Sequence, residues 1–484
     1  MSLITVRFAV VPLALLFAVP LAAQWSTALL SVARQGHSAV TVGDLALFAG
    51  GRLGQTTSSI VDIYDRTNGT WSTTSLSVPR SDLAATTIGP YAMFAGGVID
   101  AATESAVVDV FDSRTRTWST ASLSQARFQL AATTLGNKAI FAGGAFGGIG
   151  TGSALASAVV DIYDAALGAP GDPNAWSTTV LSRARGGLAA ESAGGQAVFA
   201  GGFDGTAALA TVDIYDDASG TWSTAALSQA RLLTESAAAS MGTRICFVGG
   251  QTDATTMSPM IEVYDTSNGT WSTSMMSIAR LRPGVTVVGS YVIIAGGTMN
   301  GFLTTDVVDT FDPISGTFGA SQQLSIARGD FVGVTVGGRA LFAGGRTGGA
   351  TAVRRVDILD QPSLEVVRLG SPTNPDALRP GTTSGPTLGA TWDPRIDHAS
   401  FLPGALLDVL LVGFTPDNLP SPFGTILCDT NGAIALTGPS GSPFAVSIPL
   451  DEQLLGVTLS VQGVSIDASN VALANALDIT LGSR

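Results

Sequence analysis

Short runs of apolar residues alternate with polar turn residues along most of the chain up to residue 360. The stretch 37–80 shows the pattern, with "HSAVTV" at 37–42, "LALFAGG" at 45–51, "IVDIYD" at 60–65 and "WSTTSL" at 71–76. Each run is rich in β-branched or aromatic residues and is bounded by Gly, Asn or Asp, which is typical of antiparallel strands joined by tight turns. The pattern predicts an all-β protein made of four-stranded units.

This unit recurs seven times, and three landmarks mark it. The first is a diglycine after an apolar run, which begins at Gly50, Gly96, Gly143, Gly201, Gly249, Gly296 and Gly344. The second is "VDxYD" or a variant, which ends at Asp65, Asp112, Asp164, Asp216, Asp265, Asp312 and Asp360. The third is an aromatic residue followed by Arg, in the pairs Trp25/Arg34, Trp71/Arg80, Trp118/Arg127, Trp176/Arg185, Trp222/Arg231, Trp271/Arg280 and Phe318/Arg328.

The diglycine, the "VDxYD", the spaced aromatic and the Arg resemble the kelch repeat over about positions 25–360. This resemblance implies a seven-bladed β-propeller with four-stranded antiparallel blades. The chain begins with a fourth-strand element at Trp25, and its last repeat ends with a third-strand element at Asp360. We therefore expect the N-terminal strand to complete blade seven and leave no free edge. The alternative is that "SLEVVRL" at 363–369 supplies that strand.

The repeated residue types suggest roles in the scaffold. The diglycine is expected where main chains crowd and a Cβ atom would clash. The repeated aromatic residue is expected to fill the gap between neighbouring blades. The repeated Arg and Asp are expected to bond each other or loop backbone groups, and a ring of seven functional arginines is the alternative.

The two ends of the chain differ from the repeats. Residues 1–23 combine one Arg, an apolar run and "PLAA", which predicts a cleaved signal peptide and a protein that is secreted, periplasmic or on the cell surface. The propeller is expected over 24–362, a Pro/Gly/Ser-rich linker over 363–387 and a small β-sandwich over 388–484. The phrases "LLVGF", "PFGTILCD" and "NALDITLG" resemble C-terminal modules of exported bacterial repeat proteins.

Composition narrows the function classes. The net charge is −13 and the basic residues are scattered, so a nucleic-acid partner is not expected. No stretch of 18 apolar residues follows the signal peptide, so the mature chain is expected to have no membrane span. The protein is expected to be a monomer. Cys246 and Cys428 predict neither a disulfide framework nor a zinc site, and no cofactor or metal is expected.

Loop variability points to a ligand face. Turns between strands one and two, and most of those between strands three and four, keep constant spacing, whereas the loops after each diglycine and the residues after each repeated Arg vary. Both variable sets fall at one end of the blades, which we call the 2–3/4–1 face, and we expect a ligand there or at the channel mouth. The candidate residues are Asp82, Phe128, Gln129, Phe203, Asp204, Glu235, Arg282, Asn300, Asp330 and Arg346.

The function expected from these observations is non-catalytic binding of an extracellular glycan or protein through this face. The alternative is a carbohydrate-active enzyme, of the glycosidase or sugar isomerase type, with carboxylates at the channel mouth. A copper-radical oxidase is excluded because it needs two histidines in one site, and His37 and His398 fall in different domains. Trp392 and His398 are expected to be packing and solvent-facing residues.

Overall fold

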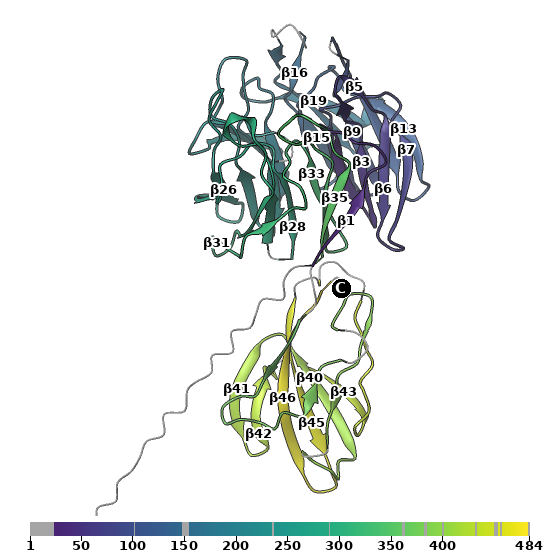
Figure 1. Cartoon of the computed structure of the whole chain (residues 1–484), viewed down its shortest axis with the longest axis vertical. Coiled ribbons are helices and arrows are strands. Elements are labelled where there is room, and N and C mark those ends of the chain that lie inside the picture. Colours follow the sequence, from purple (N-terminus) through teal and green to yellow (C-terminus); the bar gives the residue numbers. More distant parts are fainter. Residues whose placement is uncertain are drawn as a thin grey trace, which may run out of the picture.

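The computed structural model describes residues 24–484 except 101, 148–153, 235–236, 290, 361–363, 382–384, 399–400, 431–432, 450–453, 455–456 and 483–484. Figure 1 shows a propeller of strands followed by a smaller β domain. The predicted signal peptide lies outside the described residues. Within the described part, the helices are the single turns η1 (Pro173–Ala175) and η2 (Asn300–Phe302), and no helix is long and apolar enough to cross a membrane.

Seven antiparallel sheets, which we number as blades one to seven, make up the described part of the propeller. Blade one consists of β2 (Ser38–Val42), β3 (Leu45–Ala49), β6 (Ile60–Asp65) and β7 (Thr70–Ser75). Blade two consists of β8 (Ala84–Ile88), β9 (Tyr91–Ala95), β12 (Val107–Asp112) and β13 (Thr117–Ser122). Blade three consists of β14 (Ala131–Leu135), β15 (Lys138–Ala142), β18 (Val159–Asp164) and β19 (Trp176–Val180). Blades four and five are β20 (Ala189–Ala193), β21 (Gln196–Ala200), β22 (Thr211–Asp216), β23 (Thr221–Ala226); β24 (Ala238–Met241), β25 (Arg244–Val248), β26 (Met260–Asp265), β27 (Thr270–Met275). Blade six consists of β28 (Gly284–Val288), β29 (Tyr291–Ala295), β30 (Val307–Asp312) and β31 (Thr317–Phe318), and β32 (Gln322–Gln323) also pairs with β30. Blade seven consists of β33 (Val332–Val336), β34 (Arg339–Ala343), β35 (Arg355–Asp360) and β1 (Gln24–Leu29).

The blades close into a ring. The first strand of each blade contacts the first strands of its two neighbours, in one cycle from β2 through β33 and back to β2. In blade seven, β1 pairs antiparallel with β35, with Trp25 opposite Leu359. The predicted all-β propeller is confirmed, and the N-terminal strand completes blade seven as expected. The alternative strand at 363–369 is wrong, because β36 (Leu364–Arg368) pairs instead with β46 (Val471–Thr480) in the C-terminal domain.

The apolar core of the propeller lies between successive blades. One cluster joins Val40 and Leu47 of blade one to Leu83 and Phe94 of blade two. Trp118 on β13 packs at the edge of this cluster, with its ring 5.1 Å from that of Phe111. Burial of these side chains holds neighbouring blades together, which is the packing function predicted for the repeated aromatic residue.

The diglycines permit a close approach between blades. Gly50 has a φ of +72°, and a Cβ atom on it would lie 2.5 Å from the carbonyl oxygen of Arg80. Because no side chain fits there, the loop that leads into blade two can lie directly against the end of β3. This is the crowding that the sequence predicts.

The repeated arginines belong to the scaffold. All seven are completely buried, and each forms an ion pair with the first carboxylate of a "VDxYD" segment, such as Arg80 with Asp109 at 2.6 Å and Arg127 with Asp161 at 2.7 Å. Arg80 also donates to the carbonyl oxygen of Phe94 at 2.9 Å. Burial lowers the pKa of these arginines, and the neighbouring carboxylate offsets part of that effect. They cannot reach a ligand, so the alternative of seven functional arginines is wrong.

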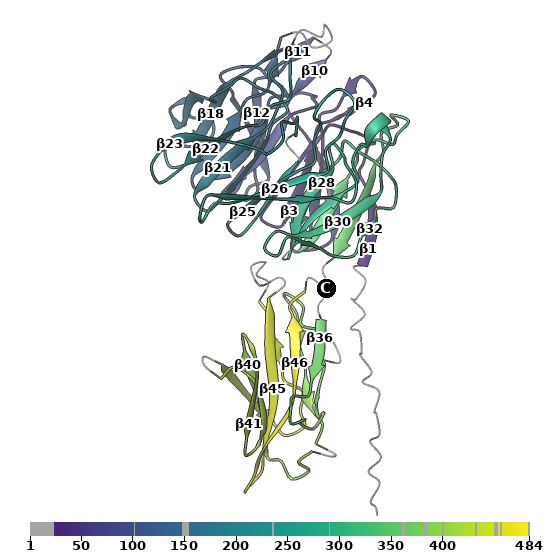
Figure 2. The ribbon, with the colours of Figure 1, turned by 90° about the vertical axis from the view of Figure 1, so that its left-hand side faces the viewer.

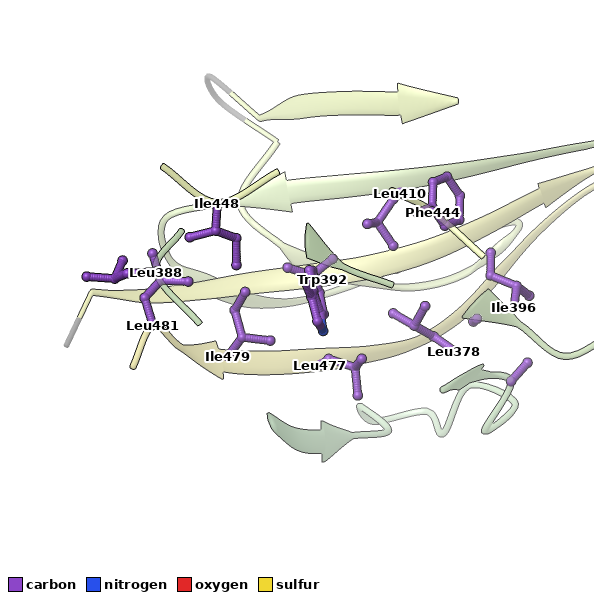
Figure 3. Packing of buried hydrophobic residues seen from close by; sticks show 13 residues of the cluster. Leu378, Leu388, Trp392, Ile396, Leu410, Phe444, Ile448, Leu477, Ile479 and Leu481 are labelled. Atoms are coloured by element: carbon purple, nitrogen blue, oxygen red, sulfur yellow. The ribbon is translucent and has the colours of Figure 1, made fainter. Parts of the chain in front are cut away.

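The C-terminal domain is built on one five-stranded sheet, in the order β36, β46, β45 (Thr458–Ile466), β40 (Leu407–Gly413) and β43 (Ile434–Pro439). Three two-stranded ribbons accompany it: β37 (Leu378–Arg379) with β39 (Arg395–Ile396), β38 (Thr391–Trp392) with β44 (Val446–Ser447), and β41 (Pro416–Ser421) with β42 (Gly424–Cys428). Figure 3 shows Trp392 in the middle of the apolar core, between Leu477 of the sheet and Ile448.

This domain begins earlier than the sequence suggests. Residues 364–368 form the edge strand β36, and Leu378 lies in the core, although both fall in the segment predicted to be a linker. Trp392 is a core residue, and its Nε1 donates to Glu365 on β36 at 2.5 Å. The composition of 363–387 is rich in Pro and Gly and does not indicate strands. The strand at 364–368 is stabilised by pairing with β46, about a hundred residues later, which no local pattern indicates.

Candidate functional site

The loops after the diglycines gather at one end of the propeller. In blades one to three they form small hairpins, β4 (Arg52–Leu53) with β5 (Thr56–Thr57), β10 (Val98–Asp100) with β11 (Thr103–Glu104), and β16 (Ala145–Phe146) with β17 (Leu155–Ala156). Figures 1 and 2 show these hairpins at the end opposite to the one where β35 leads on to the C-terminal domain. This is the 2–3/4–1 face.

At the centre of this face the chain forms a ring of left-handed residues. The residues two positions after the repeated Arg, or three in blade five, all have positive φ, between 51° and 107°: Gly36, Asp82, Gln129, Gly187, Thr234, Arg282 and Asp330. Five of the seven are not glycine, and such residues adopt this conformation only when their surroundings impose it.

Backbone hydrogen bonds impose it here. The amide of Asp82 donates to the carbonyl of Gly36 at 2.9 Å, and the amide of Gln129 donates to that of Asp82 at 3.1 Å. Equivalent bonds join Gly36 to Asp330, Gly187 to Gln129 and Thr234 to Gly187. The loop that leads into each of these blades is therefore bonded to the loop of the blade before it, which makes the channel mouth a rigid frame.

The space inside this frame is small. A cavity of about 30 Å³ is lined by His37 and by four predicted site residues, Asp82, Gln129, Arg282 and Asp330. The other lining residues are Gly36, Thr234, Phe331 and Val332. The volume corresponds to about one water molecule. The predicted residues do converge at the mouth, but the cavity there cannot admit a sugar.

The charges at the mouth are already paired. Asp330 accepts from Arg282 Nη1 at 2.9 Å and from Arg346 Nε. Burial acts to raise the pKa of Asp330, but the two guanidinium groups outweigh it, so the pKa lies below its ordinary value. Asp330 is therefore unsuited to be the general acid that a glycosidase needs at this position.

A much larger cavity, of about 760 Å³, opens over blades three to five on the same face. It is lined by residues from the loops into these blades and from their 2–3 loops: Phe128, Gln129, Gly186, Leu232, Ala145, Ala154, Ala156, Phe203, Gly205, Thr206, Ala207, Ala208, Gln251, Thr252, Asp253 and Ala254. Of the predicted site residues, Phe128, Gln129 and Phe203 meet here.

The loop into blade four places a glycine, Gly186, in the lining of this cavity. This loop reads Gly186–Gly187, where blade three has Phe128–Gln129. A Cβ atom on Gly187 would lie 2.3 Å from Leu232 Cδ1, so the leucine of the neighbouring loop occupies the space that a side chain would take. Leu232 itself lines the cavity, and a side chain at 187 would displace it.

The lining of this cavity is apolar with a few uncharged polar groups. Phe128, Phe203 and Leu232 supply apolar surface, and Gln129 and Gln251 supply amides. No Arg or Lys is among the described lining residues. The one carboxylate, Asp253, accepts hydrogen bonds from the backbone of Thr255 at 2.9 Å and of Thr256 at 3.0 Å, and these bonds lower its pKa. The cavity therefore favours neutral ligands over anionic ones.

The remaining predicted residues lie elsewhere. Asp204 accepts from the backbone of Thr206 and Ala207 and pairs with Arg183, so it stabilises its own loop. Asn300 Oδ1 accepts from the backbone amide of Met257 at 2.8 Å and joins two loops. Glu235 lies outside the described residues.

Sequence reasoning missed Leu232, Gln251 and the two glycines of blade four. In the structure, the residue after each diglycine and the residue after each repeated Arg form a β-bridge, as in Leu232 with Gln251 and Gly186 with Phe203. Both positions can be read from the spacing of the repeat, so pairing them blade by blade would have brought Leu232 and Gln251 together. These two positions therefore lie side by side in each blade. The left-handed ring also left a trace, since Gly36 and Gly187 fall at the same distance from the repeated Arg.

His37 is buried beside the mouth, where the matching residues of blades two to four are Leu83, Leu130 and Leu188. Its ring lies against Gly344, and only 2% of the residue is exposed. Burial lowers the pKa of His37 well below 6.5, the charge of Arg34 lowers it further, and the backbone of Ala343 offsets only part of this. The ring therefore stays neutral and belongs to the packing between blades seven and one.

No cluster of three or more metal-ligating residues is present in the part of the chain that the structure describes. Cys246 and Cys428 are both free and buried. Burial raises the pKa of Cys246 to about 12, so its thiol is a poor nucleophile at neutral pH.

The comparison with known families matches one blade. A sequence profile described as the kelch motif matches residues 184–226, and this stretch runs from the loop before β20 to the end of β23, which is the whole of blade four. Blade four therefore carries a kelch motif, which supports the resemblance that the repeated residues show.

Among solved structures, the chain is similar to "Structure of YjhT", with 14% sequence identity and a TM-score of 0.46. The match covers 58% of this chain and 95% of that one. No curated protein matches the sequence.

Proposed function

We propose that this kelch protein is an exported, non-catalytic binding protein that takes a neutral glycan in the cavity over blades three to five. The cavity is the observation that carries the proposal. Its volume of about 760 Å³ falls within the range of ligand sites, about 300–1,000 Å³, whereas the channel mouth holds about 30 Å³. A sugar ring needs an apolar surface for its C–H face and amides or hydroxyls for its hydroxyl groups, and the lining offers both.

Charge favours a neutral glycan over other ligands. Phosphorylated, sulfated or uronic sugars need Arg or Lys, and the described lining has none. Phe203 lines the cavity and is 41% exposed, so its ring is accessible to a ligand. The neighbouring Gln129 and Gln251 can each donate and accept hydrogen bonds, which suits a sugar hydroxyl. Export remains part of the proposal, and it is supported by the signal-like sequence at 1–23.

The test is a glycan array probed with the purified chain 24–484. Ala207→Trp is expected to abolish binding, because Ala207 is an exposed lining residue and an indole there fills the cavity. Phe203→Ala is expected to weaken binding by about tenfold, since a ring contact contributes about 1–1.5 kcal/mol. The control is Leu167→Ala, an exposed apolar residue at the opposite end of blade three.

The proposal is supported if the wild type and the control bind neutral glycans and both cavity variants lose this binding. Binding of acidic glycans only, or binding unchanged by Ala207→Trp, contradicts it. If no glycan binds, while a protein partner binds and is lost with Ala207→Trp, the face is a protein-binding surface and the glycan proposal fails.

A further inference from the structure

A second site lies in the C-terminal domain, where three strands bring together side chains with no common spacing in the sequence. His398 follows β39, Asp408 lies on β40, and Ser440 comes directly after β43. His398 Nε2 lies 2.8 Å from Asp408 Oδ1, and His398 Nδ1 lies 2.8 Å from Ser440 Oγ. The prediction that His398 only faces solvent is wrong, since 13% of its side chain is exposed.

The hydrogen bonds determine which atoms carry protons. Asp408 is fully buried, and its carboxylate accepts from the Ser465 hydroxyl at 2.7 Å and from the Gly441 amide at 2.8 Å. An ionised carboxylate only accepts, so His398 Nε2 must carry the proton that it donates to Asp408. In neutral His398, Nδ1 is then the acceptor, and the Ser440 hydroxyl must donate to it. This is the protonation pattern that activates a serine.

The same carboxylate also fixes the serine. The amide of Ser442 donates to the carbonyl of Pro439 at 3.1 Å, which closes a tight turn with Ser440 and Gly441 at its centre. Gly441 has a φ of +72°, as the third residue of a type II turn requires. Its amide is the one bonded to Asp408. One buried group therefore orients both the imidazole and the turn that carries the hydroxyl, while Ser440 itself remains partly exposed.

We infer that Ser440, His398 and Asp408 form a nucleophilic serine site that reacts with acyl esters. In the reaction, Ser440 Oγ attacks the ester carbonyl as its proton passes to His398 Nδ1. The new Oγ–C bond forms, the ester C–O bond breaks, and the alcohol leaves with the proton from His398. Water then attacks the acyl-serine, gives a proton to His398 and releases the acid, and Ser440 regains its proton. Asp408 is a positioning residue. This inference does not depend on the glycan proposal.

The first experiment uses a fluorophosphonate probe on the folded chain 24–484, with the modified residue found by mass spectrometry. Ser440 Oγ displaces fluoride from phosphorus, and the proton again goes to His398. We expect one adduct, on Ser440, that Ser440→Ala removes. His398→Asn should slow labelling at least a hundredfold, the loss expected for a general base. Ser442→Ala is the matched control, because Ser442 closes the same turn through its backbone amide while the hydroxyl bonded to His398 is that of Ser440, and the variant should label normally.

The second experiment separates positioning from folding. Hydrolysis of p-nitrophenyl acetate is followed against pH in the wild type and in Asp408→Asn, and the denaturation midpoint of each is measured first. Loss of the carboxylate should lower the acylation rate while KM stays the same, because an asparagine amide can donate to His398 Nε2 and then favours the tautomer whose Nδ1 carries a proton and cannot accept one from Ser440. No labelling of Ser440 in the folded wild type overturns the inference. So does labelling that is equal in His398→Asn, or a folded Asp408→Asn with an unchanged acylation rate.

Discussion

Replacing His37 by leucine is expected to remove a loss of stability that the wild-type protein suffers in mild acid. The buried ring lies between blades seven and one, and its pKa is held well below 6.5. Leucine fits this position, because Leu83, Leu130 and Leu188 occupy it in three other blades. The change therefore removes a titrating group and keeps the contact with the neighbouring blade.

The size of the effect follows from the proton that unfolding takes up. In the unfolded chain His37 titrates near 6.5, whereas in the folded site it stays neutral, so below pH 6.5 the free energy of unfolding falls as the pH falls. Relative to neutral pH, the loss is about 1.4 kcal/mol at pH 5.5 and about 2.7 kcal/mol at pH 4.5 for a ring that remains neutral when folded. The loss stops growing once the pH drops below the folded pKa.

The assay is urea unfolding at pH 7.5, 5.5 and 4.5 of the wild type, His37→Leu and the reciprocal variant Leu83→His. Between pH 7.5 and 5.5, His37→Leu should lose about 1.4 kcal/mol less than the wild type, and Leu83→His should lose more by a similar amount. His398 is present in all three proteins and cancels in the comparison. If the wild type and His37→Leu show the same pH dependence, burial does not keep the ring neutral and the reasoning is refuted.

Four further predictions concern the scaffold, each checked by denaturant unfolding except the third. Trp118→Ala should lower the free energy of unfolding by about 2–4 kcal/mol, because the ring packs between blades but is only partly buried. An unchanged denaturation midpoint would contradict that packing. Arg127→Met should lower the free energy of unfolding by about 3–5 kcal/mol, because it leaves the buried Asp161 carboxylate without its cation. Adding Asp161→Leu should recover part of this loss, and no recovery would argue against the ion pair. Cys246, with its raised pKa, should react with a thiol reagent at pH 8 only after unfolding, and rapid labelling of the native protein would disprove its burial. Burial raises the pKa of Glu191, so Glu191→Gln should raise the free energy of unfolding at pH 7.5. The substitution should have little effect below about pH 3.5, where folded and unfolded chains both hold the proton; an equal effect at both pH values would contradict this.

The propeller could be predicted because its contacts repeat. Each blade contacts its two neighbouring blades through equivalent strands, so packing requires the same residue types at the same spacing. The diglycine, Arg and aromatic positions of the repeat show this directly. The ring closure also followed, since the order of the landmarks leaves only one strand missing. The 2–3/4–1 face could be located by the opposite argument, that its loops do not repeat.

The cavity and the serine site could not be predicted in the same way. The position of Leu232 in the cavity wall depends on Gly187 having no side chain, which is a relation between two loops rather than a motif. His398, Asp408 and Ser440 come together only through the order of strands in the C-terminal sheet. The strand at 364–368 was missed for a similar reason, because its partner lies about a hundred residues later.

The pairing of β1 with β35 means that the first strand of the propeller to be made is the last one to find its partner. The first strand made must wait, unpaired, until Asp360 has been added, since six consecutive positions of β35 are its only partners in the sheet. During that interval β1 offers bare main-chain groups to the β35 strand of any other copy. A chain that emerges slowly, or at high local density, can then exchange its leading strand with a neighbour, so yield on expression should depend on how well newly made copies are kept apart.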